Sequence, residues 1–118
     1  MKSVSVQMPW PPSANRYWRK YRGRMVISEE ARKYIDDISI LALTWQIKTF
    51  KTRLSLKIAA FPPDRRVRDI DNILKIAIDS LQHAGIYEND GQIDRIYIER
   101  GLPHSPGYMD VQIEEIND

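Results

Sequence analysis

Hydrophobic and polar residues alternate along several stretches of this chain. Residues 4–8, 52–61, 95–99 and 109–113 each place apolar side chains at every second position for part of their length. Because successive side chains of a strand point to opposite faces, these stretches are predicted to be half-buried strands. Residues 25–27 form a short apolar run, which predicts a further short strand paired locally.

Two longer segments repeat their apolar residues at spacings of three and four, which is typical of an amphipathic helix. The first helix is predicted to begin after Ser28, an N-cap residue followed by two glutamates, and to reach about Ile47. The second is predicted to open at Asp71, which occupies the N-cap position, and to end at Gly85.

The predicted order is strand, strand, helix, strand, helix, strand, strand. It indicates a single α/β (α+β) domain over residues 1–118, with one small mixed sheet and two main helices packed on one face. Residues 102–107 contain two prolines and a glycine, and they are predicted to form a long hairpin connection between the last two strands.

The charges of the chain are divided between its two halves. Residues 1–68 carry fifteen Lys or Arg and five Asp or Glu, a net charge of +10, whereas residues 69–118 carry three and eleven, a net charge of −8. A basic half of this kind favours a polyanionic partner such as nucleic acid. Acidic groups close to nucleic-acid phosphates would be useful only with a metal ion between them.

Composition also excludes several classes of protein. The chain has no cysteine, so it has neither disulfides nor a thiolate metal site, and its two histidines do not favour zinc. No apolar stretch approaches the roughly 20 residues that a membrane span needs, and the first residues do not resemble a signal peptide. We therefore expect a cytoplasmic protein that has no membrane partner.

Opposite charges are concentrated between residues 64 and 92. Three arginines, Arg65, Arg66 and Arg68, lead into Asp69 and Asp71. The two aspartates flank one residue of an extended segment, so both can point the same way. Together they fit a hard divalent cation such as Mg²⁺, with the arginines binding phosphate. Asp90 follows the second helix, and it can join them only if the fold brings it back.

Each of these residues also has a structural interpretation. A short D-x-D motif can consist of a helix cap and a surface carboxylate beside a solvated arginine run. Lys75 lies one helical turn after Asp71, where it can hold a phosphate or form an ion pair with Asp71 or Asp79. Asn72 can bond a metal-bound water or simply start the helix.

The segment 13–24 mixes basic and aromatic residues. Its cations include Arg16, Arg19 and Lys20, and they are predicted to contact phosphates. Its aromatic residues, Tyr17, Trp18 and Tyr21, can stack on unpaired bases or pack on the sheet, and composition does not decide between the two.

The charged segment resembles the signature of the RusA family of Holliday junction resolvases, and the resemblance covers nearly the whole chain. The matching residues are Asp64, Arg65, Arg66, Arg68, Asp69, Asp71, Asn72, Lys75, Asp79, Leu81, Ala84, Gly85, Asp90 and Gln92. The segments 9–13 and 15–17 resemble the opening motif of that family. One departure is Asn89, which stands where the family often has the first of two aspartates.

The resemblance implies an endodeoxyribonuclease that acts in recombination and repair in bacteria or phages. Such enzymes are homodimers that cut two strands of a four-way DNA junction symmetrically, using Mg²⁺, for which Mn²⁺ is a plausible substitute. It implies that Asp69, Asp71 and Asp90 hold the metal, that Lys75 is catalytic and that Asn72 supports them. DNA is then expected to contact residues of both segments, namely Asn15, Arg16, Arg19, Lys20, Arg65, Arg66 and Arg68.

Two other functions fit the same residues. One is a metal-dependent nuclease that acts on other branched nucleic acids. The other is a non-catalytic junction-binding protein, in which the carboxylates only cap and pair. Replacing Asp71 by Asn separates the two classes, because a nuclease loses cutting whereas a pure binding protein is almost unaffected.

Overall fold

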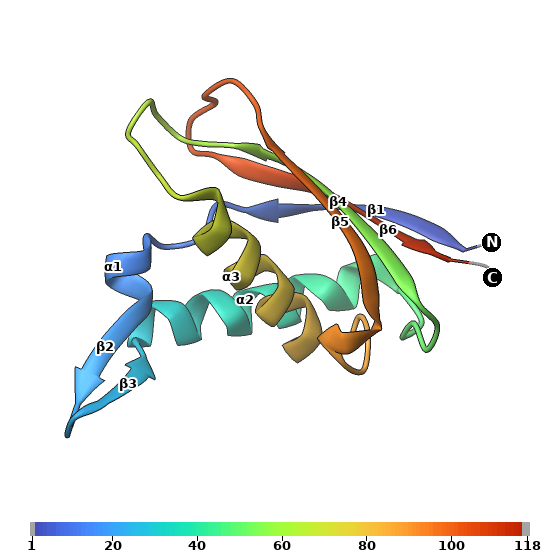
Figure 1. Cartoon of the computed structure of the whole chain (residues 1–118), viewed down its shortest axis with the longest axis horizontal. Helices are drawn as coiled ribbons and strands as arrows, with labels where there is room; N and C mark the ends of the chain where they lie inside the picture. The colour runs from blue at the N-terminus through green and yellow to red at the C-terminus, as the bar shows by residue number, and fades with distance from the viewer. Residues whose placement is uncertain (1, 117–118) are drawn as a thin grey trace.

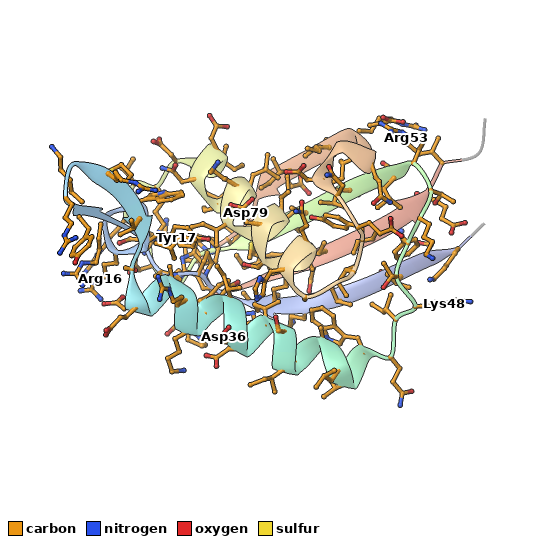
Figure 2. All side chains as sticks on the ribbon, turned by 90° about the horizontal axis from the view of Figure 1, so that it is seen from below. Arg16, Tyr17, Asp36, Lys48, Arg53 and Asp79 are labelled. Atoms are coloured by element: carbon orange, nitrogen blue, oxygen red, sulfur yellow. The ribbon has the colours of Figure 1, made fainter. Side chains whose placement is uncertain are left out.

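A computed structural model describes residues 2–116 and, within them, all side chains except those of residues 14 and 15. A four-stranded sheet forms one layer, and two long helices lie together on one of its faces (Figure 1). Figure 2, seen from the helical side, shows both helices in front of the strands. The predicted mixed α and β architecture, with its order of main elements, is confirmed.

The sheet has the strand order β1-β6-β4-β5. Its members are β1 (Ser3–Pro9), β6 (Tyr108–Glu115), β4 (Leu54–Phe61) and β5 (Ile93–Arg100). β6 pairs antiparallel with both β1 and β4, whereas β5 runs parallel to β4. The sheet is therefore mixed, and β4 to β5 is a β-α-β crossover.

The two long helices are α2 (Glu29–Trp45) and α3 (Ile70–His83). The predicted cap of α2 is confirmed, since the Ser28 hydroxyl accepts a hydrogen bond from the Ala31 N–H at 3.1 Å. The predicted start of α3 is wrong by a short distance: Asp69 is the N-cap, and Asp71 lies in the first turn. The N-cap, where the backbone of Asp69 is extended (φ −78°, ψ 123°), thus lies two residues earlier than the apolar pattern indicated.

Four short elements complete the described part of the chain. Helix α1 (Ala14–Tyr17) leads directly into a hairpin of β2 (Trp18–Tyr21) and β3 (Arg24–Ile27). The local pairing expected for residues 25–27 is thus present, with a partner strand inside the basic segment. A single 3₁₀ turn, η1 (Asp90–Gln92), precedes β5.

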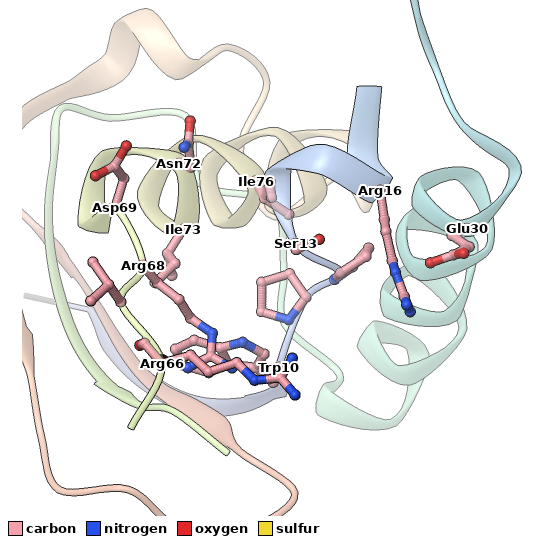
Figure 3. A pocket seen from close by; sticks show the side chains of 13 residues that line it. Trp10, Ser13, Arg16, Glu30, Arg66, Arg68, Asp69, Asn72, Ile73 and Ile76 are labelled. Carbon is pink, nitrogen blue, oxygen red and sulfur yellow. Dashed lines mark hydrogen bonds between the residues drawn. The ribbon is translucent and has the colours of Figure 1, made fainter. Parts of the chain in front are cut away.

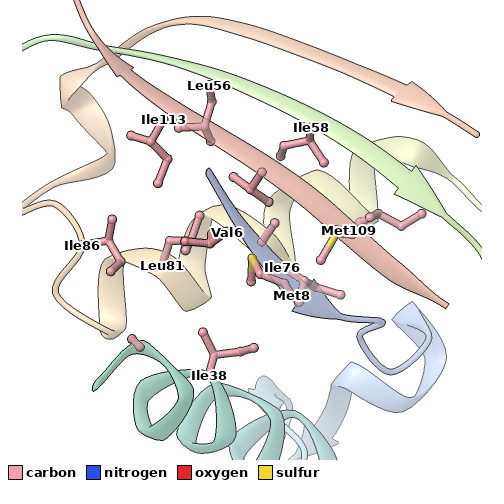
Figure 4. Close-up of a cluster of buried hydrophobic side chains, with 14 of the residues drawn as sticks. Val6, Met8, Ile38, Leu56, Ile58, Ile76, Leu81, Ile86, Met109 and Ile113 are labelled. Atoms are coloured by element: carbon pink, nitrogen blue, oxygen red, sulfur yellow. The ribbon is translucent and has the colours of Figure 1, made fainter. Parts of the chain in front are cut away.

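The core lies between the sheet and the helices (Figure 4). Alternation along β6 shows how it forms, because Met109, Val111 and Ile113 are buried whereas Asp110 and Gln112 are exposed. The helices contribute side chains such as Ile38, Ile76 and Leu81 to the same cluster. Among the described residues, no helix has both the length and the apolar character that crossing a membrane requires.

The predicted hairpin between the last two strands is wrong. β4 lies between β5 and β6, so residues 101–107 cross the end of β4 instead of turning back beside β5. The Gly101 N–H donates to the Ala60 carbonyl at 2.8 Å, and the His104 N–H donates to the Pro62 carbonyl at 2.7 Å. Because α3 delivers β5 to one edge of β4, the last strand pairs with the other edge.

Ser28 joins the hairpin to α2, and its replacement tests that junction. Its hydroxyl caps α2 and also donates to the Arg16 carbonyl, while 5% of the residue is exposed. We expect Ser28→Ala to lower the free energy of unfolding by about 1–2 kcal/mol in urea titrations, because both bonds are lost. Thr44→Ala, at an exposed site of the same helix, should change it by less than about 0.5 kcal/mol. Equal effects of the two substitutions would contradict the capping role.

Candidate DNA-binding and catalytic site

The arginine run forms a loop that leaves the carboxyl end of β4. Asp64 organises it: its carboxylate accepts from the Arg66 N–H at 3.0 Å and pairs with the Arg68 guanidinium at 2.8 Å. The Arg66 N–H and, after it, the Arg68 guanidinium lower the pKa of Asp64 below its ordinary value. The carboxylate therefore stays charged at neutral pH, and it holds the loop in a turn.

A second brace comes from the neighbouring strand. Arg100, the last residue of β5, donates to the Arg68 carbonyl at 2.6 Å. Arg68 in turn donates to the Asp64 and Arg66 carbonyls, at 3.3 and 3.2 Å. Its side chain is only 21% exposed, whereas that of Arg66 is 84% exposed. Arg68 thus shapes the loop, and Arg66 remains available to an outside anion.

The arginine loop forms one wall of a cleft (Figure 3). The opposite wall is the proline-rich segment 10–13 with Arg16 of α1, and the first turns of α3 contribute Asp69 and Asn72. The Arg68 guanidinium lies 5.7 Å from the centre of the Trp10 ring, close enough for a cation–π contact. The cleft thus brings together Arg16 of the first predicted DNA-binding segment, Arg66 and Arg68 of the second, and the predicted metal ligand Asp69.

Asp69 and Asp71 lie together at the start of α3, and both are exposed. Asp69 is the N-cap residue but makes no side-chain capping bond, and Asp71 lies in the first turn. Two solvated carboxylates at one helix start, beside an arginine loop, are well suited to a hard cation. The structural interpretation of the motif as a helix cap and a surface carboxylate is therefore not supported by a side-chain capping bond of Asp69.

Asp90 lies elsewhere, beside the second half of α3. Its N–H donates to the Gln82 side-chain oxygen at 2.9 Å. Burial raises the pKa of Asp79; Lys75 opposes this rise and the charge of Asp90 adds to it, so Asp79 and Asp90 are electrostatic neighbours. Asp71 and Asp79 are eight residues apart on one helix, or about 12 Å along its axis.

A single chain does not bring the three predicted ligands together. In the range 2–116, no group of three or more acidic, histidine or cysteine side chains is placed to hold one ion. The reason is topological. Asp69 and Asp71 follow the carboxyl end of β4, whereas Asp90 precedes the amino end of the parallel strand β5, so the two groups lie at opposite ends of the strands.

The turn that carries Asp90 is rigidly held. The Gln92 side chain accepts from the Glu88 and Asn89 N–H groups at 2.9 Å and donates to the Phe50 and Thr52 carbonyls at 3.1 and 3.0 Å. The Asn89 side chain accepts from the Gly91 N–H at 2.7 Å. An aspartate could accept the same bond, so the departure at Asn89 preserves the turn.

The remaining predicted residues surround α3 and α1. Lys75 forms no ion pair with Asp71 or Asp79 in the described chain, and its ammonium nitrogen lies 6.0 Å from the centre of the Trp18 ring. Arg65, Arg19 and Lys20 are exposed outside the cleft lining. The predicted contact by Asn15 falls on a side chain outside those described.

The structure decides between packing and base stacking for one aromatic residue of the basic segment. Tyr17 is 1% exposed and belongs to the core, so it packs and cannot stack on bases. Tyr21 is 59% exposed, and Trp18 is half-buried beside Lys75.

Comparison with known proteins agrees with this geometry. A model of the endodeoxyribonuclease RusA family matches residues 9–114, which include both walls of the cleft. The chain belongs to the RusA family.

RusA relatives match over nearly their whole length. A protein of Enterobacteria phage HK97 named crossover junction endodeoxyribonuclease is 39% identical over 117 residues, covering 98% of both chains. Proteins of the same name from Shigella sonnei strain Ss046 and Escherichia coli strain K12 are 33% and 32% identical, covering 100% of this chain and 99% of theirs. The similarity thus extends from β1 to β6.

Sequence reasoning missed two contributors to the RusA cleft. Trp10 lies against Arg68, and Arg100 holds the Arg68 carbonyl. The only sequence signal for Trp10 was the proline-rich opening motif, to which no role was assigned. Arg100 gave no signal, because its position depends on the parallel pairing of β4 with β5.

The ion pair of Asp64 can be tested by proteolysis. Asp64→Asn keeps an oxygen for the Arg66 N–H but removes the charge that holds Arg68. We expect trypsin to cut the native protein after the loop arginines about two- to five-fold faster, because the loop opens more often. Asp94→Asn, which removes a similar exposed pair with Arg53, should leave cutting in this loop unchanged. Equal rates in Asp64→Asn and the natural protein would show that Asp64 does not order the loop.

Proposed function

We propose that this chain is a divalent-metal-dependent endodeoxyribonuclease that cuts four-way DNA junctions. The observation that carries the proposal is the joining of the two family motifs, the opening segment and the arginine–aspartate loop, as the walls of one cleft. The names of its full-length relatives support the same activity. Those relatives come from phages and bacteria, which favours action in the bacterial cytoplasm.

DNA phosphates are proposed to bind the arginines of the cleft. Arg16 and Arg66 reach it from opposite walls, and Arg68 is fixed between Trp10 and Asp64. Planar guanidinium groups bind phosphate with two donors, and a pre-ordered group loses little freedom on binding. The cleft is thus suited to hold one backbone segment close to Asp69.

The proposed ion is Mg²⁺, with Mn²⁺ as a substitute, and its ligands are the exposed carboxylates Asp69, Asp71 and Asp90. Oxygen donors of this kind fit the ion, but one chain supplies them as two separate groups. When bound, such an ion activates water and neutralises charge on a phosphate. Lys75, between the two groups on α3, is proposed to hold the scissile phosphate, with Asn72 supporting Asp69.

A homodimer would solve the separation of the carboxylates. A two-fold axis can place the Asp69–Asp71 group of one copy against the Asp90 group of the other, and it repeats that contact twice. Two identical sites related by such an axis also match the two-fold symmetry of a four-way junction. We therefore propose that each site combines residues of two copies.

A junction-cutting assay with Asp71→Asn tests the activity. The natural protein should nick a synthetic four-way junction symmetrically in Mg²⁺ and leave a linear duplex of the same sequence intact. Asp71→Asn should lower the rate by on the order of 100-fold or more while keeping junction binding. Asp36→Asn on α2, remote from the cleft, is the matched control.

The outcomes separate the candidate functions. Preference for a flap or another branched substrate would indicate a different structure-specific nuclease. Tight junction binding without any cutting by the natural protein, in both Mg²⁺ and Mn²⁺, would leave a non-catalytic binding protein.

Mixed dimers test the shared site. Co-refolded Asp71→Asn and Asp90→Asn chains should regain nicking. About half of the dimers are mixed, and each mixed dimer has one site in which both carboxylate groups are intact. About a quarter of all sites are therefore expected to be active. Asp71→Asn mixed with Asp69→Asn should regain none, since both changes affect the same group. Recovery in neither mixture, with dimers present in sedimentation, would show that each site lies within one chain.

A further inference from the structure

The hairpin of β2 and β3 projects away from both layers of the fold (Figure 1). It is a regular two-stranded ribbon in which Trp18 pairs with Ile27, and Tyr21 pairs with Arg24. Arg22 and Gly23 form its turn with φ values of 50° and 75°. Two consecutive positive φ values are the geometry of tight hairpin turns, which match the twist of the strands. The ribbon is therefore a defined element and not a loose loop.

The charge of the ribbon has one sign. Between residues 16 and 28 the chain has five Lys or Arg and no Asp or Glu. The residues from Arg19 to Met25 are all exposed, including Tyr21 at 59% and Met25 at 65%. Among the described cationic side chains of the hairpin, only that of Arg22 has a ring contact, 5.3 Å from the centre of the Tyr21 ring.

The cations occupy both faces of the ribbon and its tip. Residues directly opposite in the register share a face, so Lys20 lies with Met25, and Arg19 lies on the other face with Arg24. Arg22 is at the turn. A ribbon that lay flat on a DNA backbone would need cations on one face only. Cations on both faces fit a place between two rows of phosphates.

We propose that the ribbon enters the major groove of one duplex arm while the cleft holds the backbone to be cut, an inference that rests on the proposed junction-cutting function. A major groove about 12 Å wide admits a two-stranded ribbon, whereas a minor groove of about 6 Å does not. The two phosphate rows that border the groove then face Arg19 and Arg24 on one side and Lys20 on the other.

The position of the ribbon fixes the distance to the cut. Its first residue, Trp18, lies beside Lys75, with 6.0 Å from ring centre to ammonium. Hydrogen bonds between the Ser28 N–H and the Tyr17 carbonyl, at 2.9 Å, and from Ser28 to Arg16 hold its base to α2. Four strand residues span about 14 Å, or about four base pairs. The tip should contact an arm about four base pairs from the cut.

A tethered cleavage reagent tests that contact. The chain has no cysteine, so Met25→Cys carries a single iron–EDTA group near the tip. With a four-way junction in magnesium-free buffer, radical scission should centre about four base pairs from the position that the natural protein cuts in Mg²⁺. The same group on Leu43→Cys, 77% exposed near the other end of α2, should give no such centre. Equal scission patterns from the two positions would overturn the proposal.

The salt dependence of binding gives a second test. Arg22→Asn with Arg24→Ser removes two cations and keeps the turn, because Asn tolerates a positive φ. The slope of log affinity against log salt should fall by about 1.8 relative to the natural protein. Lys48→Gln with Lys51→Gln removes the same charge and should leave the slope unchanged, because Lys48 lies at the end of the molecule away from the hairpin (Figure 2) and Lys51 follows three residues later.

The outcomes of these tests distinguish failure of the ribbon contact from failure of the proposed junction-cutting function. If the natural protein cuts junctions but the hairpin variant keeps its salt slope, only the ribbon contact is wrong. If the hairpin variant sediments as a smaller species than the natural protein, the ribbon is a contact between copies, and the DNA proposal is overturned. If the natural protein neither binds nor cuts a junction, the proposed function itself fails.

Discussion

The parallel pairing of β4 with β5 is the constraint on which the rest of the structure depends. A parallel pair needs a crossover, and α3 provides it on the face where α2 also packs. The arginine loop therefore leaves the sheet at one end of the parallel strands, and the turn with Asp90 enters it at the opposite end. This same pairing brings Arg100 to the Arg68 carbonyl. The parallel pairing of β4 with β5 therefore explains both the shape of the arginine loop and the separation of the carboxylates.

The cleft shows how a small fold orders a flexible basic segment. Arg68 is fixed by Asp64, by Trp10 and through its carbonyl by Arg100. Each contact is individually modest, but together they leave the loop with few alternative conformations, so less entropy is lost when a phosphate binds. Arg66 and Val67 remain exposed on this ordered support, and Val67 is 100% exposed. Arg68 thus gives the loop its shape, whereas Arg66 and Val67 are available to contact a ligand.

The division of charge along the sequence corresponds only in part to a division in space, because Lys48 and Arg53 of the basic half lie at the end of the molecule away from the hairpin (Figure 2). Cations are concentrated on the hairpin, on α1 and on the arginine loop, whereas Asp79 and Asp90 lie beside the far half of α3. Lys75 lies between them, adjacent to Trp18 at the base of the ribbon. The hairpin, α1 and the arginine loop thus form a cationic region of the kind that steers a polyanion by long-range attraction.

The sequence by itself determined the strands other than β2, the long helices, the Ser28 cap and the residues that carry charge, because periodicity and capping are local properties. It also indicated the family, since the spacing of Asp69, Asp71 and the arginines is a local motif. Only the tertiary structure decided that Trp10 joins the arginine loop, that Tyr17 is buried and that Asp90 lies apart from Asp71. These features depend on the strand order, which is set by the edge of β4 with which each later strand pairs. That pairing is a non-local interaction, and the alternation of apolar and polar residues does not predict it.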